Sequence, residues 1–299
     1  MKHAGRNRDI RLLNCPSGIR RYHWCEWILL ATLLVFGCSK DKSGNPVGPG
    51  PTDTPSPFTC TSGIWYGGQC HSADQLTAWG MGNTQSSYIH NDRLYEWYID
   101  QGTTGDCAGN NCGPSSVVMS ARWADSLFTG TVEEARDLYY NEGGWWYTNN
   151  IDDYLTTFGI THHISTFENT GQLTDQIGKG NLILLCIEMK HIRRNMNAEQ
   201  RVDRFYSYGS GHFLLVKGVR KVDDTTFFEV YDSNNWYQSY TDGSEKGENR
   251  HYRAEDLADA IDNWWGFFFI IQPGPAAAGK TVIPADAVSA DAIPHAWGR

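Results

Sequence analysis

The feature that most restricts the fold of this chain is a pair of apolar segments on either side of Asp223-Asp224. The segments His212–Val222 and Thr226–Tyr231 have the length and composition of strands, and two short polar residues between such runs are typical of a β-hairpin turn. His212 opens the first segment and Asp232 follows the second. Antiparallel pairing brings together the ends that lie away from the turn, so the hairpin predicts that His212 and Asp232 are neighbours.

A second motif lies upstream, where Cys112-Gly113-Pro114 opens the run Ser115 to Leu127. Proline suits a first helical turn, so the run predicts a helix that begins near the cysteine. A thiol at a helix N-terminus is exposed to the positive end of the helix dipole, which favours the thiolate. Gly113 lets a substrate backbone approach closely, and an amide at a helix start can point at a developing oxyanion.

These residues form a candidate catalytic triad in the chain order Cys112, His212, Asp232. Such a triad needs a thiol nucleophile, an imidazole base and an acceptor that holds the imidazole ring. The alternative interpretation takes each residue separately, as a buried structural cysteine, a core histidine and a turn aspartate. The hairpin geometry favours the triad, because it brings the second and third residues together without reference to the first.

Elsewhere, helical signals come first and strand signals follow. Thr131 followed by Glu134 has the pattern of a capping box and predicts a helix through Tyr140. The order predicts an α+β protein, with a helical N-terminal half that carries the cysteine and an antiparallel sheet that carries the histidine and aspartate. The remaining predicted elements are helices over Asn150–Phe158, Gly171–Gly178 and Tyr252–Trp264 and strands over Leu182–Glu188 and Phe267–Ile271.

Three short motifs together resemble the C39-like peptidases, a branch of the papain-like superfamily of cysteine peptidases. They are Asn-Cys-Gly-Pro-Ser-Ser with Met119, the segment Gly211–Val219 (GHFLLVKGV), and Val-Tyr-Asp ending at Asp232. The resemblance covers roughly residues 98 to 272. It implies the papain-like cysteine peptidase fold and hydrolysis of peptide bonds through a thioester intermediate. It also implies a thiolate nucleophile at Cys112, a base at His212, an orienting Asp232 and no cofactor.

The resemblance further implies a glutamine a few residues before the cysteine, as an oxyanion donor. Asp106 stands at the usual spacing, and the nearest glutamine is Gln101. We expect Gln101 to take this role if the segment from 103 to 110 loops out, with Asn111 as the substitute candidate.

Two other functions stay open. A papain-like acyltransferase or amidase, such as a transglutaminase, would use the same three residues, although the 100 positions between Cys112 and His212 (212 minus 112) are more than such enzymes usually have. A non-catalytic surface lipoprotein that binds ligands is the other possibility, and the missing glutamine at normal spacing favours it mildly.

The N-terminal segment predicts export. Residues 2 to 21 are rich in Arg and Lys, and Ile28–Gly37 is a short apolar run. Ten residues rise about 15 Å as a helix, roughly half of the hydrocarbon thickness of a bilayer, so the run fits a secretory signal better than a membrane span. It ends in Val-Phe-Gly-Cys38, which resembles the lipobox of bacterial lipoproteins and implies cleavage before Cys38 and acylation of this residue. An ordinary signal peptide with a coincidental cysteine is the alternative.

The predicted organisation follows from these signals. We expect a signal peptide at 1–37, a lipidated cysteine with a flexible tether at 38–59, the C39-like peptidase domain at 60–272 and a low-complexity tail at 273–299. The predicted location is the periplasmic or cell-surface face of a bacterial membrane. The expected partners are a peptide or protein substrate and the membrane. Nucleic acid is excluded as the main partner, because the net charge is -9 and the basic residues form no cluster outside the N-terminus.

Cysteine usage agrees with export. Five cysteines follow the predicted lipidation site, at 60, 70, 107, 112 and 186. An odd number leaves at least one free thiol in an oxidising compartment. We expect a disulfide between Cys60 and Cys70; a second between Cys107 and Cys186 would leave Cys112 as the free thiol. No metal site is expected, because the histidines at 162, 163 and 191 lack a matching Cys or carboxylate spacing.

Overall fold

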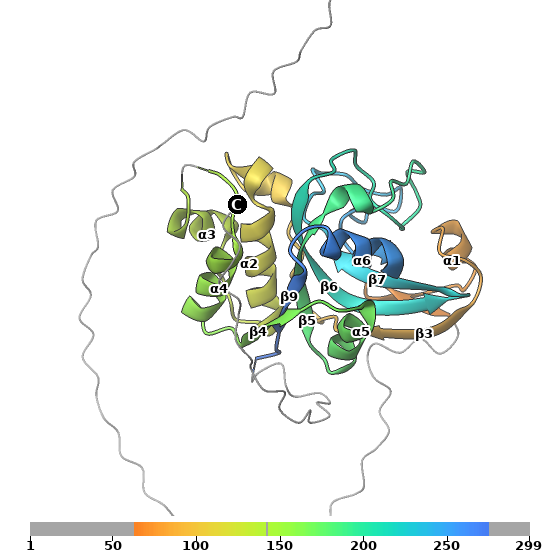
Figure 1. Ribbon diagram of the computed structural model, residues 1–299. Coiled ribbons are helices and arrows are strands. Elements are labelled where there is room, and N and C mark those ends of the chain that lie inside the picture. Colours follow the sequence, from red (N-terminus) through yellow and green to blue (C-terminus); the bar gives the residue numbers. More distant parts are fainter. Residues whose placement is uncertain (1–62, 142, 275–299) are drawn as a thin grey trace, which may run out of the picture.

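The computed structural model describes residues 63–141 and 143–274 (Figure 1). The predicted signal peptide, Cys38, the tether, Cys60 and nearly all of the predicted tail lie outside these residues. The elements are, in chain order, β1 (Ile64–Tyr66), β2 (Gln69–His71), α1 (Gln75–Ala78), β3 (Gln85–His90), η1 (Gln101–Thr103), η2 (Ala108–Asn110), α2 (Cys112–Ala124), α3 (Val132–Leu138), α4 (Thr148–Thr157), β4 (His162–Thr166), α5 (Thr170–Gly178), β5 (Leu182–Glu188), η3 (Met189–His191), β6 (Gly211–Val222), β7 (Thr225–Tyr231), β8 (Arg250–Arg253), α6 (Ala254–Asp262) and β9 (Phe267–Ile271).

The centre of the fold is a seven-stranded antiparallel sheet. Six strands follow the order β4-β9-β5-β6-β7-β8, and β3 also pairs with the long strand β6. The predicted hairpin is present as β6 and β7, whose pairing runs from Val222 opposite Thr225 at the turn to Leu215 opposite Tyr231. Asp223 adopts a φ of 49° in this turn, a left-handed conformation that aspartate tolerates better than most residues.

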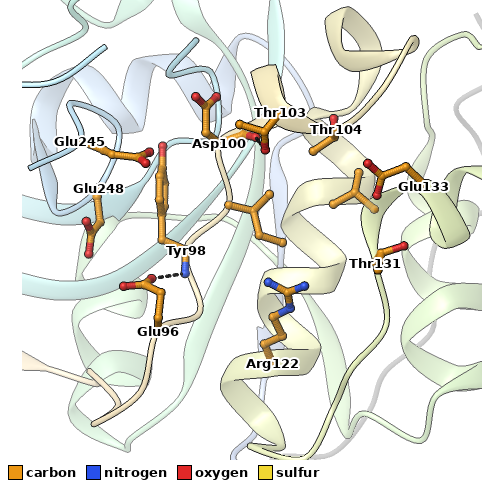
Figure 2. Close-up of a pocket in the computed structure, with 12 residues that line it drawn as sticks. Glu96, Tyr98, Asp100, Thr103, Thr104, Arg122, Thr131, Glu133, Glu245 and Glu248 are labelled. Atoms are coloured by element: carbon orange, nitrogen blue, oxygen red, sulfur yellow. Dashed lines mark hydrogen bonds between the residues drawn. The ribbon is translucent and has the colours of Figure 1, made fainter. Parts of the chain in front are cut away.

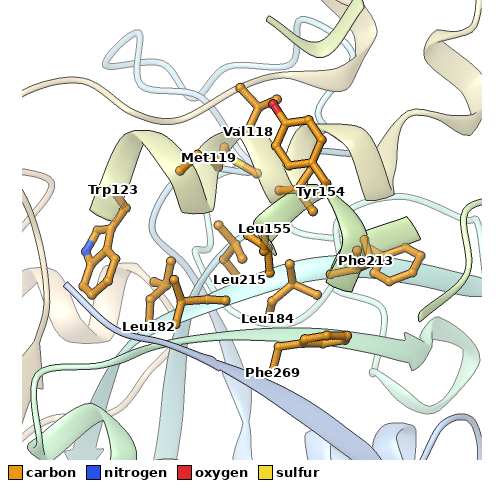
Figure 3. Close-up of a cluster of buried hydrophobic side chains, with 14 of the residues drawn as sticks. Val118, Met119, Trp123, Tyr154, Leu155, Leu182, Leu184, Phe213, Leu215 and Phe269 are labelled. Atoms are coloured by element: carbon orange, nitrogen blue, oxygen red, sulfur yellow. The ribbon is translucent and has the colours of Figure 1, made fainter. Parts of the chain in front are cut away.

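The sheet is buried on both faces, and strand alternation divides its side chains between two cores. Leu184 and Cys186 of β5 face a core shared with α2, α3 and α4. Leu185 and Ile187 face a second core shared with α5 and α6. Figure 1 shows these helix groups on opposite sides of the sheet, and Figure 3 shows side chains of α2 and α4 meeting those of β5, β6 and β9. Fully burying one such apolar side chain contributes about 1.5–3 kcal/mol, so both layers are held firmly on the sheet.

The sequence-based fold class is confirmed, since a helical part carrying Cys112 packs on an antiparallel sheet carrying His212. Strands β5 and β9 have the predicted bounds. The predicted helix over Tyr252–Trp264 is wrong at its start. Tyr252 belongs to β8, where it pairs with Phe228, and the helix begins only at Ala254. Four short strands, β1 to β4, also lie in the part of the chain where helical signals dominate.

Strand β4 shows why these short strands were missed. Its sequence, HHIST, has little apolar character, and each of its residues is either half-buried or exposed. The strand forms because β9 offers it a backbone partner along its whole length, from His162 opposite Ile271 to Thr166 opposite Phe267. Within the described residues, no helix combines the length and the apolar character needed to cross a membrane.

Candidate active site

Cys112 is the first residue of α2, and the helix leaves its first backbone N–H groups free of side-chain caps. The N-cap residue, Asn111, makes no capping hydrogen bond. Its side chain instead donates to the Thr104 carbonyl at 3.0 Å and accepts from Arg136 Nε at 2.9 Å. The first intrahelical bond runs from Ser115 N to Asn111 O, at 2.8 Å. The N–H groups of the first turn are therefore not taken up by a side-chain cap.

Gly113 is required at the second position of the helix. A Cβ atom on this residue would lie 2.9 Å from Trp146 Cβ and 3.4 Å from Phe213 Cδ2. The first of these separations is shorter than real carbon contacts allow, so a larger residue would push the start of α2 away from its neighbours. The glycine thus sets how closely Cys112 approaches the sheet.

The hairpin of β6 and β7 places His212 and Asp232 next to each other, as predicted from the sequence. His212 Nε2 lies 2.7 Å from Asp232 Oδ1, and the two side chains are 2% and 0% exposed. This bond occupies Nε2 of the ring, which leaves Nδ1 for the thiol. The hydrogen bond between Cys112 and His212 completes the line thiol, imidazole, carboxylate. All three predicted triad residues are brought together.

The electrostatics of the pair favour the charged forms of both groups. Burial alone would raise the pKa of the Cys112 thiol, but the hydrogen bond and positive charge of His212, with the backbone N–H groups of Phe213 and Gly113, bring this pKa below its ordinary value. Burial alone would lower the pKa of His212, but the negative charge and hydrogen bond of Asp232, together with Cys112, raise it to about 10. Both shifts favour the thiolate of Cys112 together with the imidazolium of His212.

The Asp232 carboxylate is fully used as an acceptor. Besides His212, it accepts from Tyr206 Oη at 2.7 Å, from Asn234 N at 3.0 Å and from Tyr252 Oη at a short separation. Burial would raise the pKa of Asp232, but the charge of His212 and these hydrogen bonds hold it below its usual value. The carboxylate stays ionised, and its orientation is fixed by donors from three separate segments.

Gln101, the expected oxyanion donor, is buried beside the site on η1. Its Nε2 donates to Ala108 O at 3.2 Å, and its Oε1 accepts from Ser233 Oγ at 3.0 Å. A primary amide has two hydrogens, so one hydrogen of Gln101 is still open among the described contacts. The substitute candidate, Asn111, directs its amide nitrogen to the Thr104 carbonyl and hydroxyl. Both of its hydrogens are therefore occupied. Asp106, at the usual spacing, is exposed.

A loop after Asp232 is fastened to the Gln101 segment by one buried carboxylate. Asp100 accepts from the backbone N–H of Trp236 at 2.9 Å, of Tyr237 at 2.7 Å and of Gly102 at 2.8 Å. Trp236 and Tyr237 have φ values of 53° and 60°, an uncommon conformation for bulky residues. Two of the three backbone hydrogen bonds hold these residues in place, and the third, from Gly102, ties the same carboxylate to η1.

The same segment lines a polar cavity of about 450 Å³ (Figure 2). Its walls come from the stretch before η1, from α2, from the start of α3 and from the loop before β8, and they carry the carboxylates of Glu96, Asp100, Glu133, Glu245 and Glu248. Burial, followed by the charge of Glu96, raises the pKa of Glu248 to about 7. Cys112 and His212 are not among the lining residues, so the cavity is separate from the triad.

The cysteines correct one expectation. Cys70 and Cys107 each take part in a disulfide bond, while Cys112 and Cys186 are both free and buried. The pairing of Cys107 with Cys186 is therefore wrong, because β5 places Cys186 inside the core against Phe213. The expected bond between Cys60 and Cys70 involves a residue outside the described range. Within residues 63–141 and 143–274, no three His, Cys, Asp or Glu side chains group as a metal site requires.

Sequence reasoning missed three residues that support the triad. Tyr206 and Tyr252 reach Asp232 from a loop and from a short strand, and no local pattern marks either one. Arg136 of α3 is 3% exposed and donates to Asn111 Oδ1 and Asn110 O, just before α2, and to Gly144 O in the segment before α4. A single arginine within VEEARDL is ordinary for a solvated helix, so only its burial identifies it.

Comparisons with known proteins concern the fold. No family model matches the chain, and no curated protein sequence matches it. A C39-like peptidase from Bacillus anthracis is similar in structure, with a TM-score of 0.43, 10% identity and coverage of 62% of this chain and 98% of that chain. UfSP from C. elegans is similar with a TM-score of 0.37 and 14% identity, and the match covers 62% of this chain and 34% of the UfSP chain. A digestive procathepsin L2 proteinase from the larval midgut of Tenebrio molitor is similar with a TM-score of 0.35 and 12% identity. This match covers 66% of this chain and 72% of that chain. The chain thus spans about a third of the UfSP chain.

Proposed function

We propose that this protein is a papain-like cysteine peptidase that hydrolyses peptide bonds through a thioester intermediate. The observation that carries the proposal is the buried line of Cys112, His212 and Asp232, with His212 Nε2 at 2.7 Å from Asp232 Oδ1. A buried histidine held by a saturated carboxylate next to a thiol of lowered pKa has no evident packing purpose. It is the arrangement that thiol nucleophiles use.

Acylation is the first half of the reaction. The Cys112 thiolate attacks the carbonyl carbon of the scissile amide, and the carbonyl oxygen becomes an oxyanion. The backbone N–H groups at the start of α2 and the open hydrogen of the Gln101 amide are the donors for this oxyanion. The His212 imidazolium then transfers its proton to the leaving amine as the C–N bond breaks. The amine departs and the acyl group remains on sulfur as a thioester.

Deacylation reverses these roles. The now neutral His212 removes a proton from water, whose oxygen attacks the thioester carbonyl. A second oxyanion forms at the same donors, the C–S bond breaks, and the carboxylic acid product leaves. The thiolate and imidazolium are restored. Asp232 holds the imidazole ring and stabilises its charge throughout, without itself accepting the proton.

The test is the pH dependence of Cys112 alkylation by iodoacetamide, with mass spectrometry to identify the labelled thiol. We expect fast labelling of Cys112 at about pH 6, because only a thiolate reacts and this thiol ionises below its ordinary pKa. His212→Ala should delay labelling to about pH 8.5, the range of a model thiol. A Cys112 profile that resembles a model thiol and ignores His212 would refute the proposed mechanism.

Cys186 is a control within the same molecule. It is free and buried like Cys112, but its pKa is raised well above the ordinary value by burial and by the nearby charge of Cys112. Equal labelling of both thiols at pH 6 would mean that the protein has opened, not that Cys112 is activated. Cleavage of a mixed peptide library by the wild-type chain, absent in Cys112→Ala, then establishes the reaction.

We further propose that the protein is exported and anchored by acylation of Cys38. The apolar run at 28–37 and the lipobox-like residues support this proposal, and disulfide bonding of Cys70 and Cys107 fits an oxidising compartment. Expression of the full chain in a bacterium with labelled palmitate should yield a labelled, detergent-phase protein. Cys38→Ser should remove the label and release the protein into the aqueous phase. A labelled Cys38→Ser variant would contradict the assignment.

A further inference from the structure

A second carboxylate lies close to the catalytic pair and has no role in the mechanism. Glu188 ends β5, directly opposite Gly211, the residue before His212. Strand alternation puts it on the same face of the sheet as Cys186, the face that packs against α2 and Cys112. The side chain is therefore held on the thiol's side of the sheet, by a strand that is buried along its whole length.

The carboxylate of Glu188 is only half satisfied. The residue is 6% exposed. Its Oε2 has a long contact with Lys190 Nζ at 3.5 Å, while no donor among the described residues reaches its buried Oε1. A buried carboxylate oxygen without a partner is costly, and such a group is usually paired or aimed at a ligand. Lys190 is 61% exposed, so it can move aside without breaking buried contacts.

The surroundings of Glu188 suit a long cationic side chain. The Trp264 indole covers Gly211, with Cζ2 2.5 Å from where a Cβ would stand, and it is 44% exposed. Tyr208 is 39% exposed and donates to Gly211 O at 3.2 Å. Burial and then the charges of Cys112 and Glu188 raise the pKa of Tyr208, so these groups lie within electrostatic reach of one another. Aromatic faces bind the methylene stem of lysine or arginine and attract its charge.

We propose that Glu188 is a specificity-determining residue that binds a Lys or Arg side chain of the peptide substrate near the scissile bond, with Trp264 and Tyr208 against its stem. The inference rests on the proposed peptidase function and names its substrate class. A cation at this place pairs with the unsatisfied Oε1 and displaces the loose contact with Lys190. An acidic substrate residue is repelled, and an apolar one leaves the carboxylate unpaired.

The experiment uses the full chain and fluorogenic peptide pools in which each position flanking the cleaved bond is lysine, norleucine or glutamate in turn. Norleucine keeps the stem of lysine and lacks the charge. At one position we expect the kcat/KM ratio of lysine to norleucine to exceed about tenfold, and Glu188→Gln to reduce this ratio to near one. Glu255→Gln, which removes an exposed carboxylate at the start of α6, should leave the ratio as in the wild type.

The outcomes separate the two proposals. Cleavage with equal rates for lysine and norleucine at every position overturns the role of Glu188 and leaves the peptidase function intact. Cleavage with a lysine preference that survives Glu188→Gln does the same. No cleavage of any pool by the wild-type chain refutes the peptidase function, and this inference with it. Since the lysine-to-norleucine ratio is measured on the wild type, the proposal can fail even if the variant does not fold.

Discussion

Replacing Asp232 by asparagine should separate the geometry of the triad from its charge. The change preserves the shape of the side chain but removes the negative charge that faces His212 at 2.7 Å. It also turns one acceptor oxygen into a donor that faces other donors, because Asp232 accepts from Tyr206 and Tyr252 as well. His212 should lose most of its positive charge near neutral pH, and Cys112 should then lose its thiolate.

The magnitude follows from the raised pKa of His212. A rise from 6.5 to about 10 corresponds to about 5 kcal/mol, at about 1.4 kcal/mol per pH unit. This figure is a net value, because burial of His212 opposes the rise while Asp232 and Cys112 both contribute to it. Since the pKa is higher in the folded protein, the stabilisation is complete below pH 6.5 and is lost as the pH rises through about 10. We expect Asp232→Asn to lower the free energy of unfolding by about 2–5 kcal/mol at pH 6, and by less at pH 10.5.

Two measurements check this prediction. Urea unfolding at pH 6 and pH 10.5 gives the loss of stability, and iodoacetamide labelling gives the thiolate fraction of Cys112. Asp152→Asn is a matched control, because Asp152 Oδ1 also pairs with a histidine nitrogen, that of His162 at 2.9 Å, but its side chain is 47% exposed. That pair should be worth no more than about 1 kcal/mol and should not affect Cys112. Asp232→Asn with an unchanged labelling profile, or with the same loss of stability at both pH values, would refute the reasoning.

Three further substitutions probe the support of the site. Tyr252→Phe removes a donor to Asp232 and should lower the free energy of unfolding by about 1–3 kcal/mol in urea; an unchanged value would show that water replaces the hydroxyl. Arg136→Met leaves Asn111 Oδ1 and two backbone carbonyls unpaired, so we expect the free energy of unfolding to fall by about 2–4 kcal/mol. Labelling of Cys112 should also move to higher pH, and an unchanged labelling profile would rule out an electrostatic role for the guanidinium. Gly113→Ala should lower the free energy of unfolding by about 1–3 kcal/mol through overpacking, and it should slow the alkylation of Cys112 at pH 6. Labelling at the wild-type rate would contradict close packing at the start of α2.

The parts of the site that the sequence predicts are those with a local signature. The hairpin needs only strand periodicity and a turn, and it places His212 beside Asp232 without knowledge of the rest of the fold. The helix that begins at Cys112 is marked by proline in its first turn. Both predictions depend on residues that are close in sequence or paired across one turn, where propensity and pattern are most informative.

The parts that the sequence does not predict depend on tertiary packing. Tyr252 lies in a stretch with helical spacing of apolar residues, yet β7 recruits the first part of this stretch as a strand. Arg136 is placed by the contact between α3 and the start of α2, which no pattern within either helix encodes. Cys186 was expected to pair with Cys107, but an apolar strand fixed in the core cannot turn its thiol toward a loop.

The nucleophile and the base are attached to separate layers of the protein. Cys112 is carried by α2, which packs in one core, whereas His212 lies on β6 of the sheet. The distance between the Cys112 sulfur and the His212 imidazole therefore depends on how α2 packs on β5 and β6. A substitution that tilts or shifts α2, even far from the site, changes the alignment of the reacting atoms. The reaction rate is therefore sensitive to the packing between the helix and the sheet.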